Sequence, residues 1–180
     1  LNMLSSDARK DLKELWDAKL KAVGFESLAY EDFSEAFWSY SLPDSATLSE
    51  FSARLAEVWM ADEYTSNMAL MYLRLLTSAQ IRSDVPFYQA FIIDDAAVNV
   101  PRWCERNVEA VNVDADQLQV IALGNALSMD LIVVSLGSGS DPDGLQINCF
   151  KPNSPPPSFN PRFIAHLLYR PGHYDLLTCK

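Results

Sequence analysis

Residues 163–177 read FIAHLLYRPGHYDLL, and this stretch decides the fold because it contains two short strand patterns joined by a tight turn. Phe163–Tyr169 is apolar enough to form one strand, and a second strand is predicted at His173–Leu177. Between them, Arg170-Pro171-Gly172 brings together proline and glycine, the two residues that most often interrupt regular structure. The segment therefore predicts a β-hairpin near the end of the chain.

Two more strands are expected upstream of this hairpin. Leu131–Leu136 is rich in β-branched residues, and Leu145–Phe150 alternates between apolar and polar side chains. Gly137–Gly144 is expected to be a loop, and the proline-rich stretch Lys151–Pro161 excludes regular structure before the hairpin. Four strands with short connections predict a small, mostly antiparallel sheet.

The first two thirds of the chain predict helices, because apolar residues recur there at three- and four-residue steps. The longest run, Ser66–Ile81, is expected to be the central helix. Asp114 followed by Gln117 fits a capping box for the last helix, whose predicted apolar face carries Leu118, Ile121, Ala122, Ala126 and Leu127. The other predicted helices are Asp7–Val23, Tyr30–Tyr40, Leu48–Met60, Asp84–Ile92 and Val100–Val108.

Helices over residues 1–128 followed by strands over 129–180 predict an α/β fold of the α+β kind, with helices flanking the sheet. A length of 180 residues suits a single domain, and no segment is long and apolar enough to span a membrane. The formal charge of −10 repels phosphate backbones and anionic lipid. We therefore expect neither nucleic acid nor a membrane as a partner.

The cysteines indicate a reducing compartment, because Cys104, Cys149 and Cys179 are odd in number and widely spaced. This usage argues against a disulfide framework and favours the cytoplasm or the nucleus. The only histidines are His166 and His173, and no four-ligand zinc spacing can be formed from these residues. We expect neither a metal nor a cofactor.

His173 and Asp175 are the candidate catalytic pair, because strand periodicity places both on one face while Tyr174 points away. A carboxylate beside an imidazole fixes its tautomer and stabilises the imidazolium, as in the base and orienting group of a nucleophilic site. The alternative is a histidine at the sheet rim with a solvated acid beside it. Spacing alone does not choose between these two interpretations.

None of the three cysteines fits the nucleophile that such a pair would serve. An activated thiol needs a helix N-terminus or an adjacent cation to lower its pKa. Cys104 is expected inside a helix, Cys149 in a strand, and Cys179 beside the C-terminus. Gly-x-Ser-x-Gly is absent from the sequence too, so the residues alone leave the reaction undetermined.

Three segments nevertheless give the chain a resemblance to a known family. They are YLRLLTSA at residues 72–79, VIALGNALS at 120–128 and LLYRPGHYD at 167–175. On these residues the chain resembles the otubains, ubiquitin-specific cysteine proteases with an OTU-like fold. The resemblance implies that His173 is the general base, that Asp175 orients it, and that the partners are ubiquitin or polyubiquitin and a ubiquitin-conjugating enzyme.

The family's Asp-Gly-Asn-Cys element, which supplies the nucleophile, does not occur in these residues. Since Leu1 is not an initiator, we expect that element upstream of it, so that residues 1–180 are one OTU-like domain without its N-terminal portion and are inactive alone. Gln117 and Gln119 replace histidines of many relatives, which leaves the ubiquitin contacts open. The alternatives to a protease are a non-catalytic module that binds ubiquitin or a conjugating enzyme, and an inert structural subunit.

Overall fold

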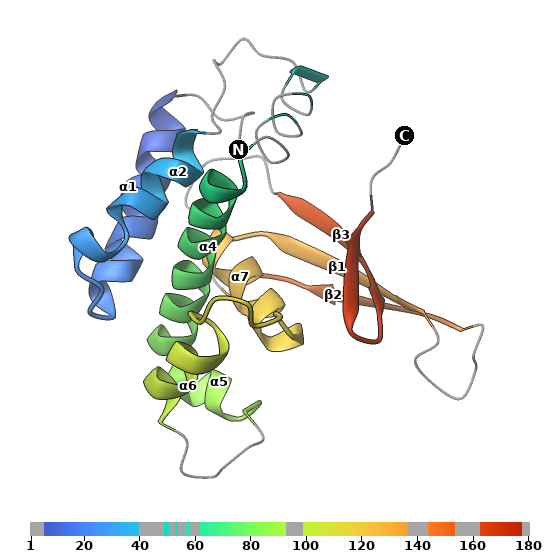
Figure 1. Ribbon diagram of the computed structural model, residues 1–180. Helices are drawn as coiled ribbons and strands as arrows, with labels where there is room; N and C mark the ends of the chain where they lie inside the picture. Colours follow the sequence, from blue (N-terminus) through green and yellow to red (C-terminus); the bar gives the residue numbers. More distant parts are fainter. Residues whose placement is uncertain are drawn as a thin grey trace. The chain divides into compact units, whose positions relative to one another are not determined.

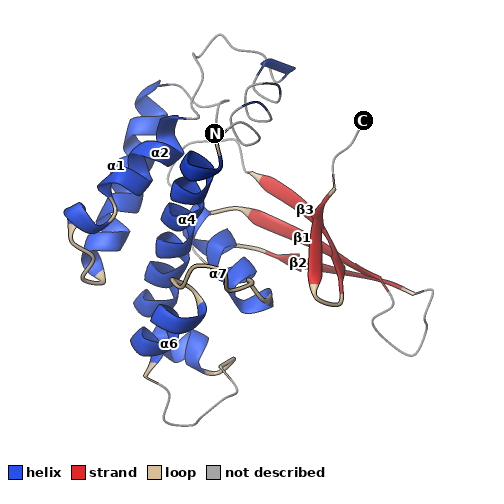
Figure 2. Ribbon diagram, viewed as in Figure 1, coloured by secondary structure: helices blue, strands red, loops and turns tan. Residues whose placement is uncertain are grey.

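The computed structural model describes residues 6–39, 49–50, 53, 57, 62–92, 99–136, 144–153 and 163–177. Helices come first along the chain and strands last, as the sequence predicts (Figure 1). The backbone divides into two compact units, residues 1–116 and residues 117–180. In Figure 2 the first unit is helical, and the second contains one helix and the sheet. That residues 1–180 are a single domain stays a prediction.

The helices of the first unit follow the predicted runs closely. They are α1 (Ser6–Ala22), the 3₁₀ turn η1 (Ser27–Ala29), α2 (Glu31–Ser39), α4 (Glu63–Ser83), α5 (Val85–Gln89) and α6 (Val100–Asn107). The predicted helix Leu48–Met60 lies mostly outside the described residues, and the four residues described there, Ser49, Glu50, Ala53 and Glu57, are helical.

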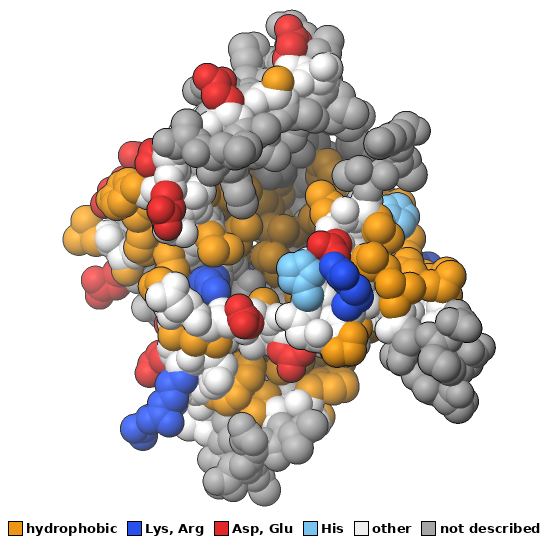
Figure 3. Space-filling model, turned by 45° about the vertical axis from the view of Figure 1, so that its right-hand side comes forward, with side chains coloured by type: hydrophobic (Ala, Val, Ile, Leu, Met, Phe, Trp, Pro, Cys, Tyr) orange, Lys and Arg blue, Asp and Glu red, His pale blue; other side chains and the backbone are white. Residues whose placement is uncertain are grey.

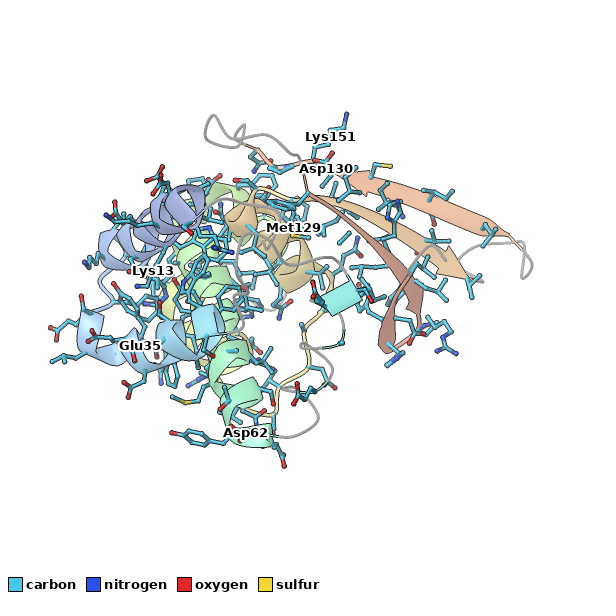
Figure 4. All side chains as sticks on the ribbon, turned by 90° about the horizontal axis from the view of Figure 1, so that it is seen from above. Lys13, Glu35, Asp62, Met129, Asp130 and Lys151 are labelled. Atoms are coloured by element: carbon cyan, nitrogen blue, oxygen red, sulfur yellow. The ribbon has the colours of Figure 1, made fainter. Side chains whose placement is uncertain are left out.

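The long helix α4 forms the centre of this unit, which confirms the predicted central helix. It begins three residues earlier than expected because the Asp62 side chain caps it, accepting a hydrogen bond from the Tyr64 amide at 3.1 Å (Figure 4). Tyr72 is fully buried among the rings of Trp16, Phe37 and Trp38. Stacked aromatic rings bury large apolar areas, so this cluster fastens α1 and α2 to α4.

A partly buried polar network joins α4 to Glu109, which lies just after α6. The Arg82 guanidinium lies 2.6 Å from Oε1 of Glu109, which also accepts a hydrogen bond from Ser78 Oγ at 2.5 Å. A charge withdrawn from water needs such a partner, and each of these two charges has one. The network therefore holds the α6 end of the unit against α4.

The second unit consists of α7 (Gln117–Leu127) and a four-stranded sheet. The strands are β1 (Asp130–Leu136), β2 (Leu145–Phe150), β3 (Ile164–Arg170) and β4 (His173–Leu176), in the spatial order β2-β1-β3-β4. Pairs β1–β2 and β3–β4 are antiparallel, whereas β1 and β3 run parallel. The expected mostly antiparallel sheet is confirmed, with one correction: its two hairpins join through a parallel pair.

Helix α7 begins later than its sequence pattern predicts. Gln117 is the first helical residue, so the capping box with Asp114 as N-cap is wrong. The turn before the helix is held by Arg74, whose guanidinium binds the carbonyl of Val113 at 2.6 Å. This contact from a distant residue outweighs a local capping preference of about 1 kcal/mol.

The buried face of α7 also carries smaller side chains than the sequence predicts. Ala122 and Ala126 are buried as predicted, but Gln119 and Gly124 complete the buried set, while Leu118, Ile121 and Leu127 are half-buried. A Cβ at Gly124 would lie 2.7 Å from Cδ1 of Leu131 in β1. Small residues thus let the helix approach the strand closely.

Lys151 and Asp130 mark the end of the sheet opposite the hairpin turn of β3 and β4. Leu131 pairs with Phe150, so Asp130 and Lys151 flank the paired ends of β1 and β2 (Figure 4).

Among the described helices, none has the length and apolar character needed to cross a lipid bilayer.

Candidate active site

The turn between β3 and β4 creates the candidate site. Arg170 pairs with His173 across the hairpin, with only Pro171 and Gly172 between them. Gly172 has a φ of 79°, a left-handed conformation that glycine adopts without strain. Proline followed by a residue with positive φ matches a type II turn, which places His173 at the rim of the sheet.

The structure brings the two predicted catalytic residues together. His173 Nε2 lies 3.0 Å from Oδ1 of Asp175, and the two side chains are 62% and 41% exposed. When Nε2 carries the proton, it donates to the carboxylate, and the lone pair of Nδ1 is left for another group. Within the described residues, Nδ1 has no hydrogen-bond partner. The predicted contact is confirmed, whereas the catalytic roles stay a prediction.

Arg170 is a third member of this cluster that sequence reasoning missed. Its guanidinium donates to Oδ2 of Asp175 at 2.6 Å, so the carboxylate bridges the arginine and the histidine. The hydrogen bond from Arg170, and secondarily that from His173, holds the pKa of Asp175 below its usual value. The sequence pattern places Arg170 in the turn, but it ends β3 and is paired with His173. A two-residue turn of Pro171 and Gly172 places Arg170 opposite His173, and this signal is present in the sequence.

Neither described cysteine can serve His173. Cys104 is fully buried in α6, and burial raises the pKa of its thiol to about 11. Cys149 is exposed on β2, but three strand spacings separate β2 from β4, which amounts to about 14 Å. Both cysteines are therefore unsuitable as nucleophiles, as the sequence indicated. Cys179 lies outside the described residues.

The cluster lies on the face of the sheet opposite α7. Strand register places Ile147, Val134, Leu168 and Asp175 in one row on one face, running from β2 to β4. Helix α7 packs on the opposite face, where Gly124 meets Leu131. Ile147 is 63% exposed, and the space-filling view shows hydrophobic side chains around the exposed histidines (Figure 3). A group that reaches His173 from this face would contact an apolar surface.

Other parts of the described structure offer weaker sites. A cavity of about 240 Å³ lies in the first unit between α4 and residues 111–114, and none of the predicted site residues lines it. Within the described ranges, no three His, Cys, Asp or Glu side chains gather closely enough to hold a metal ion. The Arg170, His173 and Asp175 cluster is therefore the principal candidate.

Comparison with known proteins supports the resemblance over almost the whole chain. Residues 4–179 match the Peptidase C65 Otubain family. The chain is 32% identical to ubiquitin thioesterase OTUB1 of Homo sapiens over 160 residues, which are 88% of this chain and 54% of that protein. It is also 32% identical to human OTUB2 over 158 residues, 88% of this chain and 62% of that protein. The chain thus spans about half the length of these relatives.

Solved structures agree with the family match. The complex named h/ceOTUB1-ubiquitin aldehyde-UBC13~Ub aligns with a TM-score of 0.72 at 27% identity, covering 99% of this chain and 68% of that one. A ceOTUB1 ubiquitin aldehyde UBC13~Ub complex aligns with a TM-score of 0.65 at 25% identity, covering 96% and 68%. These similarities confirm the α+β fold of the OTU kind. Together with the match over residues 4–179, they show that the chain belongs to the otubain family of peptidases.

Proposed function

We propose that this chain is the histidine-bearing part of a deubiquitinating cysteine protease, which hydrolyses peptide and isopeptide bonds at the C-terminus of ubiquitin. The observation that carries the proposal is the contact of 3.0 Å between His173 Nε2 and Oδ1 of Asp175, which leaves the lone pair of Nδ1 for another group. The relatives are named ubiquitin thioesterases, and the solved complexes contain ubiquitin aldehyde. We place the protein in the cytoplasm or the nucleus.

In this mechanism His173 acts first as a base and then as an acid. Nδ1 takes the proton of a cysteine thiol while Nε2–H remains bonded to Asp175. The thiolate attacks the carbonyl of the terminal glycine of ubiquitin, forming a C–S bond, and the C–N bond breaks as the imidazolium gives its proton to the leaving amine. Water then attacks the thioester carbonyl while His173 accepts a proton from it; a C–O bond forms, the C–S bond breaks, and the imidazolium returns the proton to the cysteine sulfur.

We infer from the family resemblance that the nucleophile belongs to a segment outside these residues. Cys104 is buried with a raised pKa, and Cys149 is too far from His173. Because α7 packs on the other face, we infer that the thiol approaches along the face that carries Val134 and Leu168. An apolar segment packed there would exclude water from the imidazole and strengthen its interactions.

The experiment uses the polypeptide extended at its N-terminus to the length of its relatives, with a ubiquitin derivative that bears a C-terminal electrophile. We expect a covalent adduct with the extended protein and none with residues 1–180. His173→Ala should lower turnover by about three orders of magnitude or more, with nearly unchanged affinity for ubiquitin. Asp175→Asn should be milder, because an amide oxygen still accepts from Nε2–H.

His166→Ala is the matched control, since His166 is the other histidine of the chain, is also exposed, and lies on β3. Because His166 is paired with Ile132, away from the β3–β4 turn, this variant should lower turnover far less than His173→Ala does. Turnover by His173→Ala equal to that of the unaltered protein would remove this histidine from the mechanism. A folded, extended protein that forms no adduct would contradict the protease.

The second candidate is a module that binds without cutting. It is favoured by the absence of a suitable thiol near His173 in the described residues, and by relatives solved with UBC13~Ub. On this alternative, residues 1–180 bind ubiquitin, polyubiquitin or a charged ubiquitin-conjugating enzyme. Calorimetry with each partner separates the two candidates, because retained binding without cleavage by the extended protein favours the module.

A further inference from the structure

We propose that Arg170 is a positioning residue, which fixes the carboxylate of Asp175 so that it holds His173 in the tautomer protonated at Nε2. The geometry carries this inference. Oδ2 of Asp175 accepts from Arg170 at 2.6 Å, and Oδ1 faces His173 Nε2 at 3.0 Å. The importance of that tautomer for turnover rests on the proposed function, whereas the tautomer itself is a property of this chain.

The exposure of the cluster explains why a third residue is needed. The side chains of His173 and Asp175 are 62% and 41% exposed, so water competes for both. An exposed pair of this kind contributes little by itself, since its side chains lose entropy when they are fixed in one geometry. A second bond to the free carboxylate oxygen restricts rotation of that carboxylate and reduces this loss.

Strand register brings the three polar side chains together within one hairpin. Arg170 and His173 are paired across the turn, and Asp175 is paired with Leu168, so the three polar side chains share one face. Tyr169 and Tyr174 stack on the opposite face, with their ring centroids 4.9 Å apart, which steadies the same two strands. Arg170 therefore reaches Asp175 diagonally without leaving the hairpin.

The chemical requirement is specific to one ring nitrogen. A base needs a lone pair on the nitrogen that meets the nucleophile, and the other nitrogen must carry the proton. With Asp175 rotated away, both neutral tautomers become accessible and some molecules present Nδ1–H instead. Arginine suits this task because its planar fork directs N–H groups at a carboxylate, whereas a lysine ammonium provides charge without that geometry.

The test is ¹⁵N NMR of the imidazoles of residues 1–180 at a pH where they are neutral, which reports the ratio of the two tautomers. In the unaltered chain we expect the Nε2–H form of His173 to predominate. Arg170→Gln should lower the ratio of Nε2–H to Nδ1–H about threefold, within the range that loss of one net hydrogen bond produces. Asp175→Ala should lower it at least as much, and the double variant no further than Asp175→Ala, because Arg170 acts through Asp175.

Conservative and distant variants separate positioning from a general charge effect. Arg170→Lys keeps the charge and should restore the ratio only in part, whereas Lys151→Gln, at the other end of the sheet, should leave it unchanged. His166 serves as the internal reference in every spectrum. An Arg170→Gln ratio equal to that of the unaltered chain, or full restoration by lysine, would overturn the positioning role.

Activity of the extended protein provides a separate readout. Arg170→Gln should lower kcat with little change in KM, since it alters the base and not ubiquitin binding. If the extended protein has no activity at all, the proposed function fails while the tautomer measurement still decides the role of Arg170. If activity is present and the tautomer ratio is insensitive to Arg170, the positioning inference alone fails.

Discussion

Replacing Arg74 by methionine should destabilise the helical unit substantially. The Arg74 guanidinium donates from Nη1 to the carbonyls of Val108 and Ala110 at 3.0 and 3.2 Å, and from Nη2 to that of Val113 at 2.6 Å. Methionine keeps the aliphatic packing of the side chain but leaves three carbonyls without this donor. These carbonyls belong to the segment in which Asn112 adopts a φ of 64°.

The magnitude follows from the number of bonds. A net hydrogen bond contributes about 1 kcal/mol, and charged donors contribute more, but Arg74 is only half-buried and water can reach part of the segment. We therefore expect a loss of about 3 kcal/mol in the free energy of unfolding. With a urea slope of about 2 kcal/mol/M, the midpoint of unfolding should fall by about 1.5 M.

Urea unfolding followed by helical circular dichroism measures this change. Arg74→Lys should fall between methionine and the unaltered chain, because one ammonium cannot reach all three carbonyls. Arg102→Met is the control, since Arg102 is exposed on α6 and surface changes usually stay within about 0.5 kcal/mol. An Arg74→Met midpoint as close to the unaltered chain as that of the control would refute the reasoning.

Three further outcomes are expected. Asp62→Ala removes the N-cap of α4 and should lower the free energy of unfolding by about 1 kcal/mol in the same urea assay. An unchanged free energy of unfolding would show that this cap does not stabilise the helix. Thiol labelling followed by peptide mapping should find the exposed Cys149 modified in the native protein. Cys104 is buried and its thiol has a pKa of about 11, so it should be modified only after unfolding. Labelling of Cys104 in the native protein would contradict its burial. The pKa of Asp175 in the folded chain lies below the ordinary value of 3.8, so its ion pair with Arg170 is intact above 3.8 and is lost as the pH falls through the lowered pKa. NMR titration of the carboxyl group should show this lowered pKa, and the pKa should be higher in Arg170→Gln. An Asp175 pKa that does not change in this variant would contradict the ion pair.

Much of the fold could be predicted because its signals are local. The apolar recurrence of α4 and the β-branched run of β1 each specify an element within one stretch of sequence. The β3–β4 hairpin was equally readable, since proline and glycine mark its turn. These elements appear in the structure within a few residues of their predicted bounds.

The parts that could not be predicted depend on distant contacts. The parallel pairing of β1 with β3 joins residues such as Asp130 and Ile164, and no local pattern encodes that choice. The start of α7 was misplaced because Arg74, far upstream, binds the preceding turn. At the candidate site, alternation predicted the contact of His173 with Asp175, but the bond from Arg170 requires knowing where β3 ends. The nucleophile was inferred from family resemblance and not from the pattern of residues.

The hairpin that carries the cluster also has a consequence for folding order. Its strands span residues 164–176, so the three polar side chains come together through contacts between near neighbours in sequence. Such contacts close rapidly, within about 1–10 μs for a hairpin, whereas β1 must find β3 across the chain. An isolated hairpin is only marginally stable, so docking onto β1 makes the arrangement permanent. The contacts among Arg170, His173 and Asp175 can therefore form early in folding, and the slower pairing of β3 with β1 stabilises them.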